Sequence, residues 1–136
     1  MSEVWAFDLD GTLIGSVLCD VLRPHAPELL GRLTDNGAIC VLWSAGGADY
    51  ARRRAEQHGI SHYFTAYYDK DRRDLDSRYL VDHFAVEHRP RVFVDDSPRD
   101  LPVGGEVIAV SQFIGGNPHD GGLLSVLQRV QGVEAQ

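Results

Sequence analysis

The chain has 136 residues, an apolar fraction of 43% and a net charge of −7, which are typical of one soluble globular domain. The negative charge disfavours nonspecific binding to nucleic acid or to an anionic membrane. No apolar run approaches the roughly 20 residues that span a bilayer, and the start at Met1–Glu3 lacks the features of a signal peptide. We therefore expect a cytoplasmic protein with a single domain over residues 1–136 and with Cys19 and Cys40 as reduced thiols.

Apolar runs of strand length alternate with helix-like segments along the chain. The run Val4 to Phe7 and the continuous run Ala38 to Trp43 predict strands, the second of them buried on both faces. A helix is expected over Pro27 to Asp35, because proline stands near its first turn. The other expected elements are helices over Ala48–His58, Leu75–Ala85 and Gly122–Val130, and strands over Tyr63–Tyr68, Arg91–Val94 and Glu106–Val110. This order predicts an α/β fold: a three-layer, Rossmann-like domain with a mostly parallel five-stranded sheet and helices on both faces.

Two carboxylates, Asp8 and Asp10, stand where the first predicted strand ends, and Gly11 and Thr12 follow at once. Two acids at the end of a buried strand are costly to fold around without a cation or a partner. In a phosphoester hydrolase, Asp8 would attack phosphorus and Asp10 would give and take a proton. A turn with two solvated acids is the competing interpretation, and the buried strand before the pair favours the functional one.

A second acidic pair, Asp95 and Asp96, follows the strand that ends at Val94, and Ser97 comes next. Adjacent acids repel each other, so a hard cation such as Mg²⁺ is their natural counter-ion. The alternative is an acidic turn in which Asp96 or Ser97 caps a short helix. One member of the pair can act as a cap while the other binds metal.

Ser44 follows the apolar strand that ends at Trp43 and precedes the small residues Ala45, Gly46 and Gly47. Its hydroxyl and free backbone N–H groups of this segment can hold a phosphate oxygen. A serine before two glycines also fits a plain turn.

Lys70 is the only lysine in a chain with twelve arginines. A cation here can offset the charge of the carboxylates and of a phosphate. A surface lysine is the alternative, and Arg72 and Arg73 compete for the same role. All four signals follow the C-terminal end of a different strand, and these ends converge on one crevice of a parallel sheet.

In this order the motifs resemble those of the haloacid dehalogenase (HAD) superfamily. They are Asp8-Leu9-Asp10-Gly11-Thr12, then Val41-Leu42-Trp43-Ser44, then Lys70, then Val92-Phe93-Val94-Asp95-Asp96. The resemblance covers about residues 3–130. Members with an acid at the position of Asp10 are mostly phosphatases, so the resemblance implies a magnesium-dependent phosphatase.

The resemblance also implies a role for each catalytic residue. Asp8 would be the nucleophile, and Asp10 the general acid and base. Ser44 would hydrogen-bond the phosphoryl group, and Lys70 would steady the charges of Asp8 and the phosphate.

The magnesium ligands implied by the resemblance are Asp8, Asp10 through its backbone carbonyl, Asp95 and Asp96. Asp96 would bind the ion directly or through water, so the sequence leaves open which of the adjacent acids is the main ligand. Mg²⁺ is the one cofactor that these motifs imply.

The spacing between motifs leaves no room for a separately folded cap domain. About thirty residues separate Thr12 from Ser44 and already contain a predicted helix, and the shorter interval from Ser44 to Lys70 contains another. The site is therefore expected to be open. Within this superfamily an open site implies a macromolecular phosphorylated substrate, or a small one when a neighbouring subunit supplies the lid.

Two further stretches are similar to the branch of phosphatases that act on the C-terminal domain of RNA polymerase. They are Arg23–Ser44, and Val94–Pro98 together with Asn117–Leu127, although Gly11 departs from the usual acid of that branch. The leading expectation is a phosphomonoesterase that works through a phosphoaspartyl intermediate. The alternatives are a polynucleotide or nucleotide phosphatase, and a non-catalytic domain of this fold that binds phosphoproteins.

Overall fold

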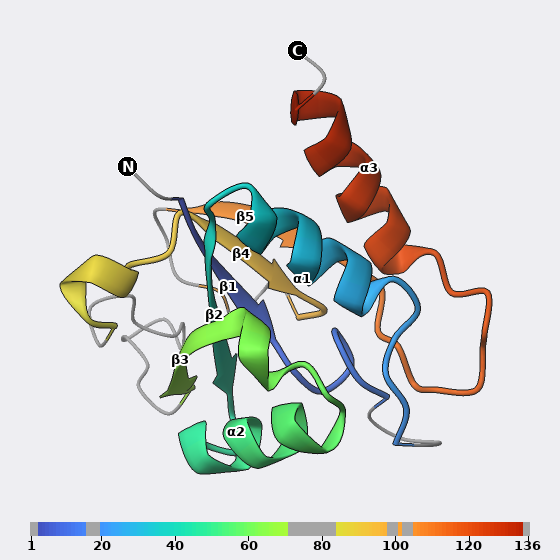
Figure 1. Cartoon of the computed structure of the whole chain (residues 1–136). Coiled ribbons are helices and arrows are strands. Elements are labelled where there is room, and N and C mark those ends of the chain that lie inside the picture. The colour runs from blue at the N-terminus through green and yellow to red at the C-terminus, as the bar shows by residue number, and fades with distance from the viewer. Residues whose placement is uncertain (1–2, 16–19, 71–83, 98–100, 102–104, 135–136) are drawn as a thin grey trace.

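Figure 1 shows the computed structural model, which describes residues 3–15, 20–70, 84–97, 101 and 105–134. Five strands form one sheet in the order β3-β2-β1-β4-β5, and every neighbouring pair among them is parallel. The strands are β1 (Val4–Asp8), β2 (Ile39–Ser44), β3 (Phe64–Asp69), β4 (Val92–Asp95) and β5 (Glu106–Ala109). The predicted α/β fold with its parallel five-stranded sheet is confirmed.

The described helices are α1 (Ala26–Asp35), α2 (Ala48–Gln57), α3 (Gly122–Glu134) and the short 3-10 helices η1 (Ser61–Tyr63) and η3 (Val86–His88). Each α-helix begins within a residue of its predicted start, and α3 continues four residues past its predicted end. None of the helices in these ranges is long and apolar enough to span a bilayer.

The helix predicted over Leu75–Ala85 falls mostly in residues 71–83, outside the described part of the chain. Its last two positions are described, and they are not helical. The backbone N–H of Ala85 donates to the hydroxyl of Tyr68 at 3.3 Å and does not join a helical ladder. The predicted C-terminal boundary of that helix is therefore wrong.

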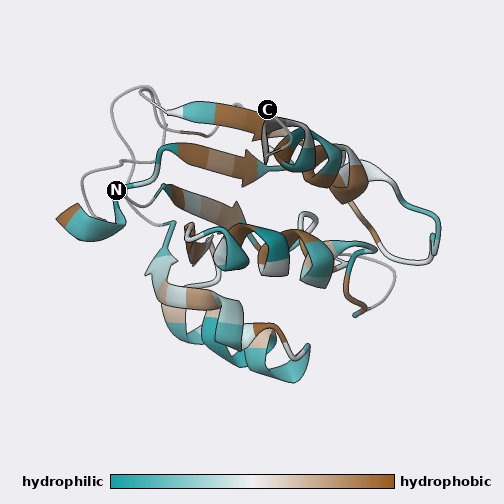
Figure 2. Cartoon of the chain, turned by 45° about the horizontal axis from the view of Figure 1, so that its top comes forward, coloured by the Kyte–Doolittle hydropathy of each residue, from teal (hydrophilic) through white to brown (hydrophobic). Residues whose placement is uncertain are grey.

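Apolar side chains cover both faces of the sheet, and the central strands are mainly brown in Figure 2. Phe7, Leu42 and Val94 face the side on which α1, α2 and α3 pack. Trp43 and Phe93 face the other side, where their ring centres lie 5.4 Å apart. No described α-helix packs on this second face, so the prediction of helices on both faces is not tested by the described residues.

The predicted thiols can be compared with the structure in part. Cys40 is a free cysteine buried within β2, and burial raises the pKa of its thiol to about 12. A thiol that stays protonated in the core acts as a small apolar side chain. Cys19 lies outside the described residues.

Strand register brings the sequence motifs to one edge of the sheet. β1, β2 and β4 end at Asp8, Ser44 and Asp95, and β3 ends directly before Lys70. The backbone N–H of Lys70 donates to the carbonyl of Ser44 at 2.9 Å, which fixes these two motifs side by side. Because all the strands run in the same direction, their C-terminal ends form a common polar edge.

Candidate active site

A pocket of about 270 Å³ opens at this edge of the sheet. The exposed residues Ala45 and Ser97 stand at its rim. Its lining contains all six residues that the sequence motifs single out: Asp8, Asp10, Ser44, Lys70, Asp95 and Asp96. Four of the six are buried and two, Asp10 and Asp96, are half-buried, so the pocket has a charged floor below an accessible mouth.

The ammonium group of Lys70 joins two acids on the pocket floor. Its Nζ donates to Asp8 Oδ1 at 2.6 Å and to Asp95 Oδ2 at 2.8 Å, and it lies 4.8 Å from the ring centre of Trp43. Burial alone would lower the pKa of Lys70, but the charges of Asp8 and Asp95 outweigh it and the pKa is raised. Lys70 is therefore a permanent cation here, and its competitors Arg72 and Arg73 lie outside the described residues.

Asp8 and Asp96 face each other across the hydroxyl of Thr12. Thr12 Oγ1 donates to Asp8 Oδ2 at 2.9 Å and lies 3.3 Å from Asp96 Oδ1. Burial, a hydrogen bond with Asp8 and the charges of Asp8 and Asp95 raise the pKa of Asp96 to about 7. Two acids in this arrangement share a proton, or they need a cation between them.

Asp95 uses both of its carboxylate oxygens. One accepts from Lys70, and the other accepts from the backbone N–H of Ser97 at 2.9 Å. Burial and the charge of Asp8 raise the pKa of Asp95. The alternative in which Asp96 or Ser97 caps a short helix depends on residues 98–100, which lie outside the described part of the chain.

Three acids of the pocket can share one cation. Asp8, Asp95 and Asp96 each offer a carboxylate oxygen, and these three oxygens lie within 4.8 Å of one another. Lys70 is the only cation that lines the pocket within the described residues, so the acids outnumber the positive charge. Clustered carboxylate oxygens are hard ligands, and the donor set fits the Mg²⁺ that the motifs imply.

Asp10 is hydrogen-bonded by Tyr50, a residue that none of the sequence motifs includes. The Tyr50 hydroxyl lies 3.0 Å from Asp10 Oδ1 and 3.1 Å from Oδ2. Burial raises the pKa of Asp10 and the hydrogen bond from Tyr50 opposes this, with a net rise. The sequence does contain one indication for Tyr50. It lies in the first turn of a helix that follows a parallel strand, and such a helix begins at the edge of the sheet where ligands bind.

Ser44 forms the turn that its sequence also allowed. Its Oγ accepts from the N–H of Gly46 at 3.0 Å, and its carbonyl accepts from the N–H of Gly47 at 3.1 Å. These amides are therefore not free to bind phosphate, contrary to one part of the expectation. The bond from Gly46 uses a lone pair of Ser44 Oγ, which leaves the hydroxyl proton for an acceptor in the pocket.

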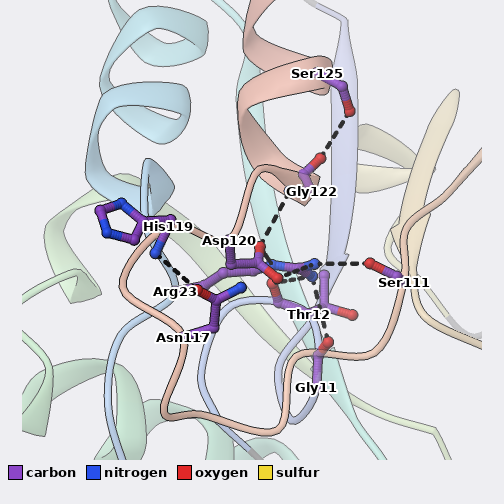
Figure 3. Close-up of polar contacts among 9 residues, drawn as sticks. All are labelled: Gly11, Thr12, Arg23, Ser111, Asn117, His119, Asp120, Gly122 and Ser125. Atoms are coloured by element: carbon purple, nitrogen blue, oxygen red, sulfur yellow. Dashed lines mark hydrogen bonds and ion pairs between the residues drawn. The ribbon is translucent and has the colours of Figure 1, made fainter.

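Arg23 anchors the loop that follows β1 (Figure 3). Its side chain is fully buried, and its Nη1 lies 3.4 Å from the carbonyl of Gly11 and 3.3 Å from that of Thr12. Its Nε donates to Asp120 Oδ1 at 2.6 Å. The loop that follows β1 is thereby tied to the segment before α3, a long-range contact that no local sequence pattern reveals.

Gly11 is required by its backbone and by its surroundings. Its φ of +83° is in the left-handed region, and a Cβ there would lie 2.5 Å from Asp96 Oδ2. The acid that the RNA polymerase C-terminal-domain branch carries at this position would clash with Asp96. This chain therefore departs from that branch at Gly11, directly beside Asp96 of the pocket lining.

The comparisons with known proteins agree with this fold and name no activity. A family model described as "Protein of unknown function (DUF705)" matches residues 1–98, which include all six predicted site residues. No curated protein matches the sequence. The structure is similar to that of an uncharacterized protein from Listeria monocytogenes serotype 4b, with a TM-score of 0.66 and 14% identity over 98% of this chain and 99% of that chain. At that identity the likeness shows the fold alone.

Proposed function

We propose that this chain, which belongs to the DUF705 family, is a magnesium-dependent phosphomonoesterase of the haloacid dehalogenase type. One observation carries the proposal: four motifs far apart in the sequence line a single pocket, in which Lys70 joins Asp8 to Asp95 and Asp10 lies alongside. A carboxylate nucleophile, a second carboxyl with a raised pKa and a fixed cation are the groups that two-step phosphoester hydrolysis needs.

In the first step a bond forms between an Asp8 carboxylate oxygen and phosphorus while the bond from phosphorus to the leaving oxygen breaks. Asp10 gives its proton to that oxygen, and burial favours this protonated form by raising the pKa of Asp10. In the second step Asp10 takes a proton from water, the water oxygen bonds to phosphorus, and the bond to Asp8 breaks. Inorganic phosphate leaves, and both carboxyl groups return to their starting states.

The remaining residues bind charge and orient groups. Lys70 and Thr12 hold the two oxygens of Asp8 in place, and the hydroxyl proton of Ser44 is available to a phosphoryl oxygen. Mg²⁺ held by Asp8, Asp95 and Asp96 would neutralise charge on the phosphoryl group.

The size of the pocket bears on the substrate. Its volume of about 270 Å³ is close to the lower limit of about 300 Å³ for sites that enclose a small molecule. It can hold a phosphoryl group and leave the rest of the substrate at the exposed rim. This favours a macromolecular phosphoester, or a small one that a second subunit covers.

Hydrolysis of 4-nitrophenyl phosphate is expected to require Mg²⁺, to stop when EDTA is added and to return with excess Mg²⁺. Protons compete with the cation for Asp96, whose pKa is about 7 without metal. Below that pH the carboxyl is protonated and neutral, and above it the carboxylate is free to bind. The Mg²⁺ concentration that gives half the maximal rate should therefore fall as the pH rises from about 6 to about 8.

Asp96→Asn provides the matched control, because its amide does not titrate. It should need more Mg²⁺ than the wild type at pH 8, where Asp96 is ionised, and show a flatter dependence on pH. Full activity of the wild-type protein in EDTA would contradict the proposal. A protein that binds phosphopeptides but hydrolyses no phosphoester would instead be a non-catalytic domain, and preferential hydrolysis of nucleotides or oligonucleotide ends would identify the nucleic-acid alternative.

A further inference from the structure

Asp10 depends on one neighbour for its orientation. Whereas Asp8 is bonded by both Lys70 and Thr12, the carboxyl of Asp10 has Tyr50 as its one hydrogen-bond partner among the described residues. The tyrosine hydroxyl lies almost equally close to both oxygens, at 3.0 and 3.1 Å. Loss of that hydroxyl would leave Asp10 free to rotate at the mouth of the pocket.

The ring of Tyr50 is fixed by the turn that precedes its helix. α2 begins at Ala48, whose N–H donates to Asp69 Oδ1, and Tyr50 lies in the first turn. A Cβ on Gly46 would lie 2.6 Å from the Tyr50 ring, so only glycine lets the ring pack this closely on the turn. The ring is thus held by packing on the turn, which places its hydroxyl beside Asp10.

Building on the proposed phosphatase activity, we propose that Tyr50 is a positioning residue that holds Asp10 for proton transfer to the leaving group. In the described part of the chain, the pocket is lined by Asp10 and not by Tyr50, so the tyrosine acts through the carboxyl group. A hydroxyl has one proton and donates it to one carboxyl oxygen at a time. The other oxygen then carries the proton that the leaving oxygen receives, while Tyr50 keeps its own proton throughout.

This role predicts a dependence on the leaving group. An alkyl phosphate has a poor leaving group that needs a proton as the bond to phosphorus breaks, whereas 2,4-dinitrophenyl phosphate has one that leaves without it. The ratio kcat/KM reports the steps up to formation of the phosphoaspartate, before Asp10 acts as a base. Tyr50→Phe should therefore lower kcat/KM roughly 10- to 100-fold for an alkyl phosphate, and by less than about 3-fold for the dinitrophenyl ester.

The second step supplies an independent readout. With 2,4-dinitrophenyl phosphate, hydrolysis of the phosphoaspartate still needs Asp10, so Tyr50→Phe should lower kcat and KM together. Tyr67→Phe is the matched control, because it removes a hydroxyl that donates to the carbonyl of Ser61 at 3.2 Å, outside the pocket. Tyr67→Phe should leave the preference between the two esters unchanged.

The outcomes separate this inference from the proposed function. If Asp8→Asn is inactive but Tyr50→Phe loses the same factor on both esters, or loses nothing, then Tyr50 does not position Asp10 and the phosphatase assignment stands. If Asp8→Asn is as active as the wild type, the proposed function fails whatever Tyr50→Phe shows. The circular dichroism spectrum of Tyr50→Phe and its Mg²⁺ requirement should match those of the wild type. If both differ from the wild type, the loss of activity reflects a change in the fold or the metal site, and this counts against a positioning role.

Discussion

Asp8→Asn is expected to lower kcat/KM for 4-nitrophenyl phosphate by roughly 10³-fold or more. An amide has no anionic oxygen with which to attack phosphorus, so formation of the phosphoaspartate stops. The substitution keeps the size of the side chain: its amide oxygen can accept from Lys70, and its NH2 group then faces the Thr12 hydroxyl, which can accept from it. The loss should therefore appear in turnover and not in the fold, and steady-state kinetics with circular dichroism on the same sample measures both.

Asp35→Asn is the matched control for this experiment. Asp35 is an exposed acid at the end of α1 and does not line the pocket, so the same chemical change there should leave the rate within a small factor of the wild type. Retention of full activity in Asp8→Asn would show that another group attacks phosphorus, or that water attacks directly.

Lys70→Met is expected to lower the free energy of unfolding by about 3–5 kcal/mol, and also to lower activity. Methionine approximates the length and shape of lysine but has no charge, so Asp8 and Asp95 would be left buried, unpaired and close together. Removing one partner of a buried ionic cluster costs far more than removing an exposed charge. Urea denaturation in EDTA measures the loss without compensation from Mg²⁺.

Two further variants serve as a control and as a test of recovery in the urea denaturation experiment. Arg53→Met changes an exposed cation on α2 and should cost less than about 1 kcal/mol. Adding Asp8→Asn to Lys70→Met removes one of the two unpaired charges and should recover part of the lost stability. An unchanged free energy of unfolding in Lys70→Met would contradict the ionic cluster as described.

The fold and the main site residues could be predicted because their signals are local. An apolar run that stops abruptly at Asp8, Ser44 or Asp95 marks both a buried strand and the end at which it opens to ligands. Once the strands are parallel, these three residues must meet along one edge, and no tertiary information is needed. The strand predicted over Tyr63–Tyr68, before Lys70, also forms, and β3 lies within a residue of these limits.

The partners of those residues could not be predicted, because they depend on how distant segments pack. Tyr50 reaches Asp10 across 40 residues of sequence, and Arg23 reaches Asp120 across 97. The contacts of Asp95 and Asp96 could not be predicted either, although these two residues are adjacent in the sequence. Adjacent acids look equivalent in sequence, but only the structure shows that Asp95 bonds Lys70 and Ser97 while Asp96 faces Asp8.

The central claim is that Asp8 carries the phosphoryl group, and Asp10→Asn with 2,4-dinitrophenyl phosphate tests it most directly. This ester needs no general acid to form the phosphoaspartate, whereas its hydrolysis needs the missing base, so the intermediate should accumulate. We predict a burst of phenolate stoichiometric with the protein, followed by slow turnover, and a phosphoryl group that mass spectrometry of the quenched protein places on Asp8. Phenolate release without a burst, or a phosphoryl group on a different side chain, would contradict the account.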